Sequence, residues 1–100
     1  MINFAEKIFF NHKIQKLFCS KSIIFINKKY MFFECSSLKE IKFGDKWNTG
    51  KVKNMNAMFY ECGALENINI SNWDIRKVTN KAYMFDGCEK IKNNIPDKFK

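Results

Sequence analysis

A repeat of about 26 residues is the feature that most restricts how this chain can fold. Three cysteines, Cys35, Cys62 and Cys88, are separated by 27 and 26 residues (62 − 35 and 88 − 62), and each follows a Met-Phe pair at the same spacing, MF-x-x-C. Similarity at a fixed period of about 20 to 50 residues indicates stacked units, because each unit buries its apolar edge only against its neighbours. The sequence therefore predicts a stack of repeats.

The similarity extends through each unit. Three copies begin at residues 31, 58 and 84, and the first two contain the pattern L-x-x-I-x-[FI]. In that pattern the first, fourth and sixth side chains of a short strand point inward, so six are predicted to be buried: Leu38, Ile41, Phe43, Leu65, Ile68 and Ile70. Further matches pair Trp47 with Trp73, Val52 with Val78 and Asn54 with Asn80, and a weaker match places Phe25 at the Val52 position and Tyr30 at the Ala57 position.

Units of the form MF-x-x-C-x-x-L-x-x-I-x-[LI]-x-x-W-[DN]-[TI]-x-x-V-x-N-M resemble the BspA-like leucine-rich-repeat surface proteins, in particular the variant of mycoplasmal surface lipoproteins. The resemblance covers about residues 25–93. It implies an α/β fold of leucine-rich-repeat type, a right-handed solenoid of short parallel strands. It also implies a place in a longer array at the cell surface or secreted, with a role in adhesion or protein binding.

Residues 1–24 are predicted to form an amino-terminal helical or capping segment, ahead of a solenoid over residues 25–100. Apolar residues between positions 3 and 19 have the spacing of an amphipathic helix, and the ends of a solenoid need an atypical cap. Charged residues interrupt every apolar run in this segment. The sequence therefore predicts neither a signal peptide nor a membrane span.

The third repeat departs from the pattern at its strand. Asn94 stands where the second Ile is expected, and Pro96 follows shortly after it. Proline cannot donate to a strand ladder, so the third strand is predicted to be distorted or an edge. We also expect the carboxyl-terminal face to be poorly sealed, its last strand to fray, and the exposed edge to pair with another chain.

The sequence offers no chemistry for catalysis or metal binding. The four cysteines form no C-x-x-C pair, His12 is the one histidine, and the four glycines are scattered. No catalytic residue, metal ligand or cofactor site is predicted, and the chain is not predicted to be an enzyme. The repeat cysteines are expected to be buried and reduced, whereas Cys19 lies outside the register. Trp47 and Trp73 are expected to stack in the core or flank of the units.

The outward-facing strand positions are the candidate binding face. Lys39, Glu66 and Lys92 are expected to form one column of alternating charge, which is either a solvated ion-pair ladder or part of a recognition surface. The complete set is Lys39, Glu40, Lys42, Glu66, Asn67, Asn69 and Lys92, with Asn93 beside the last of these.

The formal charge of +8 leaves a second function open. Lys51, Lys53, Arg76 and Lys77 could form a basic module for nucleic acid or acidic lipid, because clustered cations attract polyanions. No nucleic-acid recognition motif accompanies them, so a protein partner is favoured. The first hypothesis is accordingly a non-catalytic repeat module for protein–protein interaction or adhesion. The third is a non-functional remnant of a repeat gene.

Overall fold

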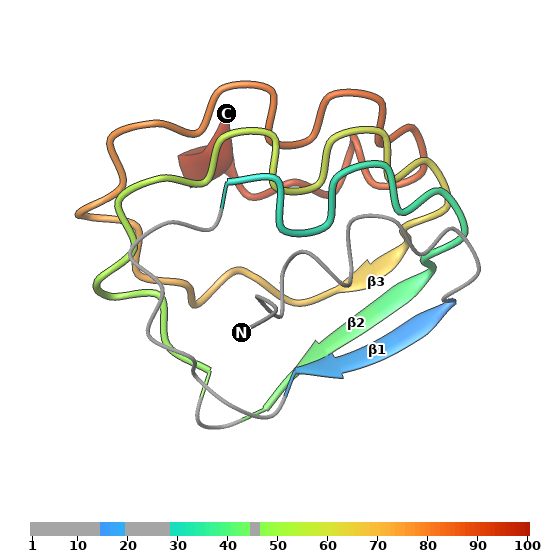
Figure 1. The fold of residues 1–100 in the computed structure, drawn as a ribbon, viewed down its shortest axis with the longest axis horizontal. Helices are drawn as coiled ribbons and strands as arrows, with labels where there is room; N and C mark the ends of the chain where they lie inside the picture. Colours follow the sequence, from blue (N-terminus) through green and yellow to red (C-terminus); the bar gives the residue numbers. More distant parts are fainter. Residues whose placement is uncertain (1–14, 20–28, 45–46) are drawn as a thin grey trace, which may run out of the picture.

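The computed structural model describes residues 15–19, 29–44 and 47–100. Three short strands, β1 (Lys16–Cys19), β2 (Glu40–Phe43) and β3 (Asn67–Ile68), form an open parallel sheet in the order β1-β2-β3 (Figure 1). In these ranges the one helical element is the 3-10 turn η1 (Asp97–Phe99). The predicted short parallel strands are thus present, with almost no helix.

Strand β1 replaces part of the predicted amino-terminal helix. It pairs with β2 in parallel, with Leu17 opposite Ile41 and Cys19 opposite Phe43. The helix prediction is therefore wrong for Lys16–Cys19, because pairing with the neighbouring strand overrides a weak helical periodicity. The remainder of the predicted cap, residues 1–14 and 20–24, lies outside the described residues.

Strand β3 confirms the register read from the repeat, because Ile41 lies opposite Ile68. Of the six inward positions, four are buried and Phe43 and Ile68 are partly buried. The intervening residues are exposed, except that Glu40 is half-buried. The period-two alternation of strand side chains accounts for this pattern.

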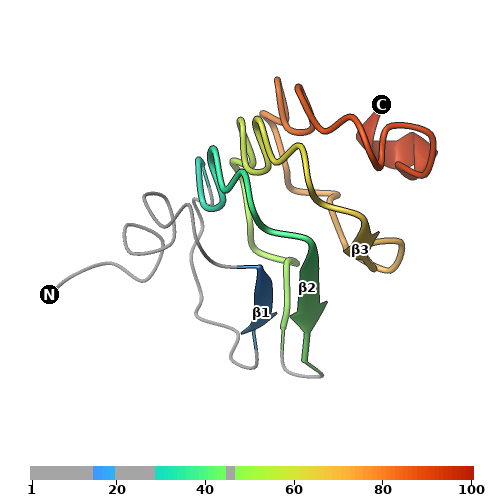
Figure 2. The same ribbon diagram turned by 90° about the vertical axis from the view of Figure 1, so that its right-hand side faces the viewer.

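The MF-x-x-C segments form a regular stack opposite the sheet, which we call the turn side. The turn segments of the three repeats run alongside one another in both ribbon views (Figures 1 and 2). The Phe32 N–H donates to the Met58 carbonyl at 2.8 Å, and the Phe59 N–H donates to the Met84 carbonyl at 2.9 Å. The Phe59 ring stacks between Phe32 and Phe85, with centroids 5.3 and 5.2 Å away.

Two positions of every turn have a left-handed backbone. Five of the six residues carry a Cβ, which makes this conformation costly by about 1–2 kcal/mol each. At the second position of the third repeat, Gly87 has φ +82°, and a Cβ built there would lie 2.7 Å from the Glu61 carboxyl carbon. The first position holds Tyr30, Ala57 and Tyr83, and the second holds Glu34, Glu61 and Gly87.

The repeat cysteines are free thiols at the centre of the stack, buried as predicted. The Cys62 thiol donates to the Phe32 carbonyl at 3.0 Å, and the Cys88 thiol donates to the Phe59 carbonyl at 2.9 Å. Burial raises the pKa of Cys35 and of Cys88 to about 11. Burial also raises the pKa of Cys62, and its neighbouring thiols add to the effect. Each thiol thus joins its repeat to the preceding one as a neutral donor.

The third repeat forms a turn where a strand was in doubt, since the Asn94 N–H donates to the Ile91 carbonyl at 2.8 Å. The expectation of a poorly sealed end is wrong, however. Phe99 is buried and contacts the rings of Trp73 and Phe85, with centroids 6.2 and 5.8 Å away. Pro96 ends the turn and η1 then directs the aromatic side chain back onto the core.

Candidate functional site

A cleft of about 940 Å³ opens where β2 and β3 separate. The two strands pair over only two residues, and beyond Ile68 the second repeat diverges from the first, as the ribbon shows (Figure 2). The cleft therefore lies between two repeats, at the carboxyl ends of their strands. Its lining comprises Glu40, Ile41, Lys42, Phe43, Gly44, Trp47, Asn48, Thr49, Glu66, Asn67, Ile68, Asn69, Asn72, Trp73 and Asp74.

The structure brings five members of the predicted binding face together around this cleft. Lys39 is exposed but is not part of the lining, and Lys92 lies in the turn of the third repeat. Lys92 is separated from the others because the third repeat forms no strand to continue their column. The five that line the cleft are Glu40, Lys42, Glu66, Asn67 and Asn69.

Ion pairing differs from the predicted ladder of Lys39, Glu66 and Lys92. Glu66 pairs with Lys90, with Nζ and Oε2 3.9 Å apart. Lys92 instead pairs with Glu89 within its own turn, at 3.1 Å. All four side chains are substantially exposed, so each pair contributes about 0–1 kcal/mol.

Three aromatic rings lie behind the polar lining. Phe43 contacts both tryptophans, with ring centroids 4.7 Å from Trp47 and 4.9 Å from Trp73. The two indoles are 5.9 Å apart, so they stack between repeats as the sequence predicts. Trp73 is buried, whereas Phe43 and Trp47 are partly exposed. The cleft consequently offers apolar ring surface beside its polar groups.

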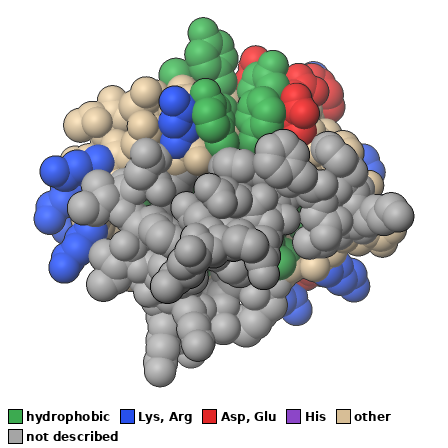
Figure 3. Space-filling view, in the orientation of Figure 1, with side chains coloured by type: hydrophobic (Ala, Val, Ile, Leu, Met, Phe, Trp, Pro, Cys, Tyr) green, Lys and Arg blue, Asp and Glu red, His purple; other side chains and the backbone are tan. Residues whose placement is uncertain are grey.

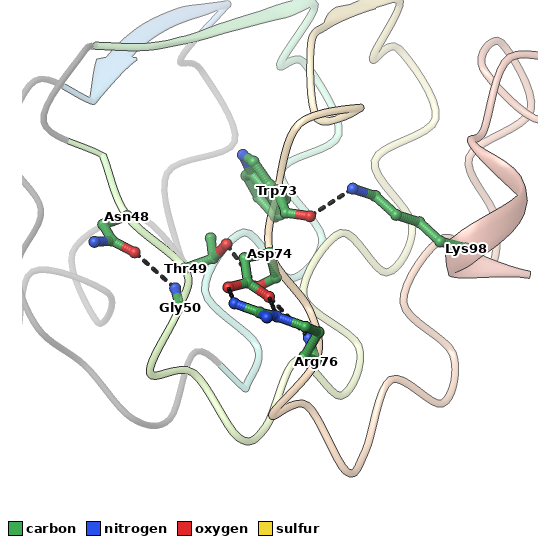
Figure 4. Close-up of polar contacts among 7 residues, drawn as sticks. All are labelled: Asn48, Thr49, Gly50, Trp73, Asp74, Arg76 and Lys98. Atoms are coloured by element: carbon green, nitrogen blue, oxygen red, sulfur yellow. Dashed lines mark hydrogen bonds and ion pairs between the residues drawn. The ribbon is translucent and has the colours of Figure 1, made fainter.

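Polar contacts fix the rim of the cleft next to the tryptophans (Figure 4). Asp74 accepts two hydrogen bonds from the Arg76 guanidinium, at 3.0 and 2.9 Å, and these hold the pKa of the Asp74 carboxyl down at about 2. The Thr49 hydroxyl donates to the Asp74 carbonyl at 2.9 Å. The Asn48 side chain accepts from the Gly50 N–H at 2.7 Å. The rim is thus a set of preformed turns.

Sequence reasoning missed Asn48, Thr49, Asn72 and Asp74 as members of the site. A usable signal existed, because Asn48 and Asp74 each directly follow the repeated tryptophan. The separation of β2 from β3 brings these residues to the same cleft as the strand positions. That separation has no signature in the repeat pattern.

The basic residues of the alternative function lie on the flank of the repeats. Lys51, Lys53 and Lys77 are exposed, and Arg76 is exposed but engaged with Asp74. In the described part of the chain no cluster of His, Cys, Asp or Glu has the arrangement of a metal site. His12 lies outside that part. No helix in the described ranges has the length and apolar content of a membrane span.

Exposed aromatic side chains mark the turn side as a second surface. Tyr30 and Tyr83 are 38% and 66% exposed at equivalent positions of their repeats. Phe33 and Tyr60 stack beside them, with centroids 5.0 Å apart. The space-filling view shows hydrophobic side chains next to acidic ones at this edge (Figure 3).

Together these features define a parallel-strand repeat protein with an amide- and carboxylate-rich cleft between two repeats. Residues 2–99 match the model of the Mycoplasma protein family of unknown function DUF285, and the chain belongs to that family. No curated protein and no solved structure matches the chain.

Proposed function

We propose that the chain is a section of a leucine-rich-repeat solenoid of the BspA-like type that binds a protein through its strand face and the cleft beside it. The face comprises Lys39, Glu40, Lys42, Glu66, Asn67 and Asn69. In repeat arrays of this kind the outward strand positions form a continuous surface, and variation there changes the ligand without disturbing the core.

The cleft is the observation that carries this proposal. Ligand sites are concave, and about 940 Å³ falls within the usual range of about 300–1,000 Å³. The cleft combines partly exposed aromatic rings with amides and carboxylates, which suits recognition of a protein surface. The exposed lysines of the flank offer no comparable concavity.

A protein array tests the proposal. The chain is applied to purified secreted and cell-surface proteins, and binding of each is measured by interferometry for three forms. These are the wild type, the face variant Lys39→Glu with Lys42→Glu, and the flank variant Lys51→Glu with Lys53→Glu. Both variants change the net charge equally, and all four lysines are exposed, so both are expected to fold.

The expected result is a small set of protein partners whose affinity falls at least about ten-fold in the face variant and stays within about two-fold in the flank variant. No protein partner, or loss in the flank variant alone, contradicts the proposal. Binding of RNA or anionic vesicles that falls steeply with salt and is lost in the flank variant would instead establish the basic module.

A further inference from the structure

The main chain around the cleft lacks the hydrogen bonds that a continuing sheet would supply. The Glu40 N–H donates to the Gln15 carbonyl ahead of β1, and the Lys39 carbonyl accepts from the Asn67 N–H. Main-chain groups alternate in direction along a parallel strand. Those of Ile41 and Phe43 are therefore turned toward the second repeat.

Asn69 is the residue that would complete this ladder. In a continuing parallel pair its N–H would donate to the Ile41 carbonyl and its carbonyl would accept from the Phe43 N–H. Pairing ends at Ile41 opposite Ile68, and in the described part of the chain no hydrogen bond joins Asn69 to either residue. The two walls of the cleft thus present main-chain donors and acceptors toward each other across an open space.

Side-chain amides extend this set of main-chain groups. Asn67, Asn69 and Asn72 line one wall, and Asn48 lines the other. Each amide carries both a donor and an acceptor, the same pair that a peptide group carries. Asn67, Asn69, Asn72 and Asn48 are all exposed, so they can meet a ligand without unfolding.

We propose that this cleft binds an extended peptide segment, which pairs through its main chain with Ile41, Phe43 and Asn69 between the two diverging strands. The inference rests on the proposed protein-binding function and specifies its partner as an unfolded segment. Addition of a strand to open main-chain groups is a general mode of peptide recognition, in which the main chain gives affinity and side-chain pockets give specificity. The partly exposed Phe43 and Trp47 rings provide the surface for one apolar side chain of the peptide.

Selection from a library of random dodecapeptides displayed on phage tests this inference. Selected peptides are synthesised, and their affinities are measured by fluorescence anisotropy for the wild type and for Asn69→Arg, which fills the cleft with a long side chain. The matched control is Asn93→Arg, the same substitution at an exposed position outside the cleft.

Each selected peptide is then remade with single N-methyl groups along its length. Pairing through the main chain predicts that methylation of alternate amides weakens binding at least about ten-fold, the equivalent of losing one well-formed hydrogen bond, while the amides between them tolerate it. We expect Asn69→Arg to weaken binding by at least the same factor and Asn93→Arg to leave it unchanged.

Three results overturn the inference: a library that yields no binder, peptides that bind Asn69→Arg as well as the wild type, and N-methyl sensitivity without alternation. None of these removes the proposed function. That function still stands where folded partners on the protein array are lost in the Lys39→Glu, Lys42→Glu variant, and it fails where that array yields none.

Discussion

The turn side and the strand side of this molecule are held together very differently. On the turn side, equivalent residues of all three repeats stack, with Phe59 between Phe32 and Phe85 at nearly parallel interplanar angles of 9° and 12°. On the strand side, β2 and β3 pair over two residues and the third repeat contributes no strand. Regular packing on one side thus leaves the other side free to open and to carry recognition.

The largest expected effect is on the central ring of the turn side. Phe59→Ala removes a fully buried side chain from the middle of the stack, and such changes cost about 3–5 kcal/mol. Phe43→Ala on the strand side should cost clearly less, since Phe43 is only partly buried. Urea unfolding followed by circular dichroism measures both. Equal losses would show that the two sides contribute alike.

Alkaline pH should act next, through the buried thiols of the turn side. The pKa values of Cys35 and Cys88 rise to about 11 in the folded state, so the folded protein keeps these protons where the unfolded chain has lost them. Their contribution is complete below the unfolded thiol pKa and is lost as the pH rises toward 11, with a slope of up to about 1.4 kcal/mol per pH unit for each thiol.

Urea unfolding at pH 8, 9 and 10 measures this slope. Cys62→Ala serves as the reference, because it removes one thiol of raised pKa and leaves the lysines and tyrosines unchanged. The slope should be shallower in the variant. Identical slopes in the two proteins would mean that the thiols are not buried in solution.

A smaller effect is expected at the carboxyl-terminal end of the strand side. The Lys98 ammonium donates to the carbonyls of Ser71 and Trp73, at 2.6 and 2.5 Å (Figure 4). Lys98→Met should therefore cost about 1 kcal/mol and should speed hydrogen exchange at Phe99 and Lys100. Lys92→Met is the control, since Lys92 forms a surface pair worth little. Rapid exchange beyond Ile91 in the wild type would restore the fraying end that the sequence predicts.

The smallest expected effect is a gain in stability on the turn side. Glu61→Gly relieves a left-handed residue at φ 59°, and the entropic cost of glycine offsets part of the gain, which leaves about 0.5 kcal/mol. Glu89→Gly, at an exposed position without a left-handed backbone, should instead destabilise. Thermal unfolding of both variants gives the sign. A lower melting temperature for Glu61→Gly would contradict the strain argument.

The turn side could be predicted almost completely from the sequence, because each of its contacts joins equivalent residues of successive repeats. The buried cysteines, the stacked tryptophans and the pairing of Ile41 with Ile68 all follow from the period. Strand β1 was missed although Ile14, Leu17 and Cys19 have the spacing of L-x-x-I-x-[FI], since Lys7 and His12 stand where Met and Ser are found in the next repeat.

The cleft and the sealed end could not be predicted, for a different reason. The repeat pattern specifies which residues are equivalent but not how far two strands stay paired. The cover provided by Lys98 and Phe99 arises from contacts with Ser71, Trp73 and Phe85 that have no counterpart in the other repeats. Each of these features depends on side chains that occur once.

The hydrogen bonds of the turn side also give the molecule an electrical polarity. Every described backbone bond between the turn segments runs from an N–H of one repeat to a carbonyl of the next, so the peptide dipoles add along the stack as they do along a helix. The positive end lies at the third repeat. There the N–H groups of Tyr83, Phe85 and Gly87 occupy the donor positions, and no described residue accepts from them. Asp86 lies among them, so its negative charge complements this end of the dipole.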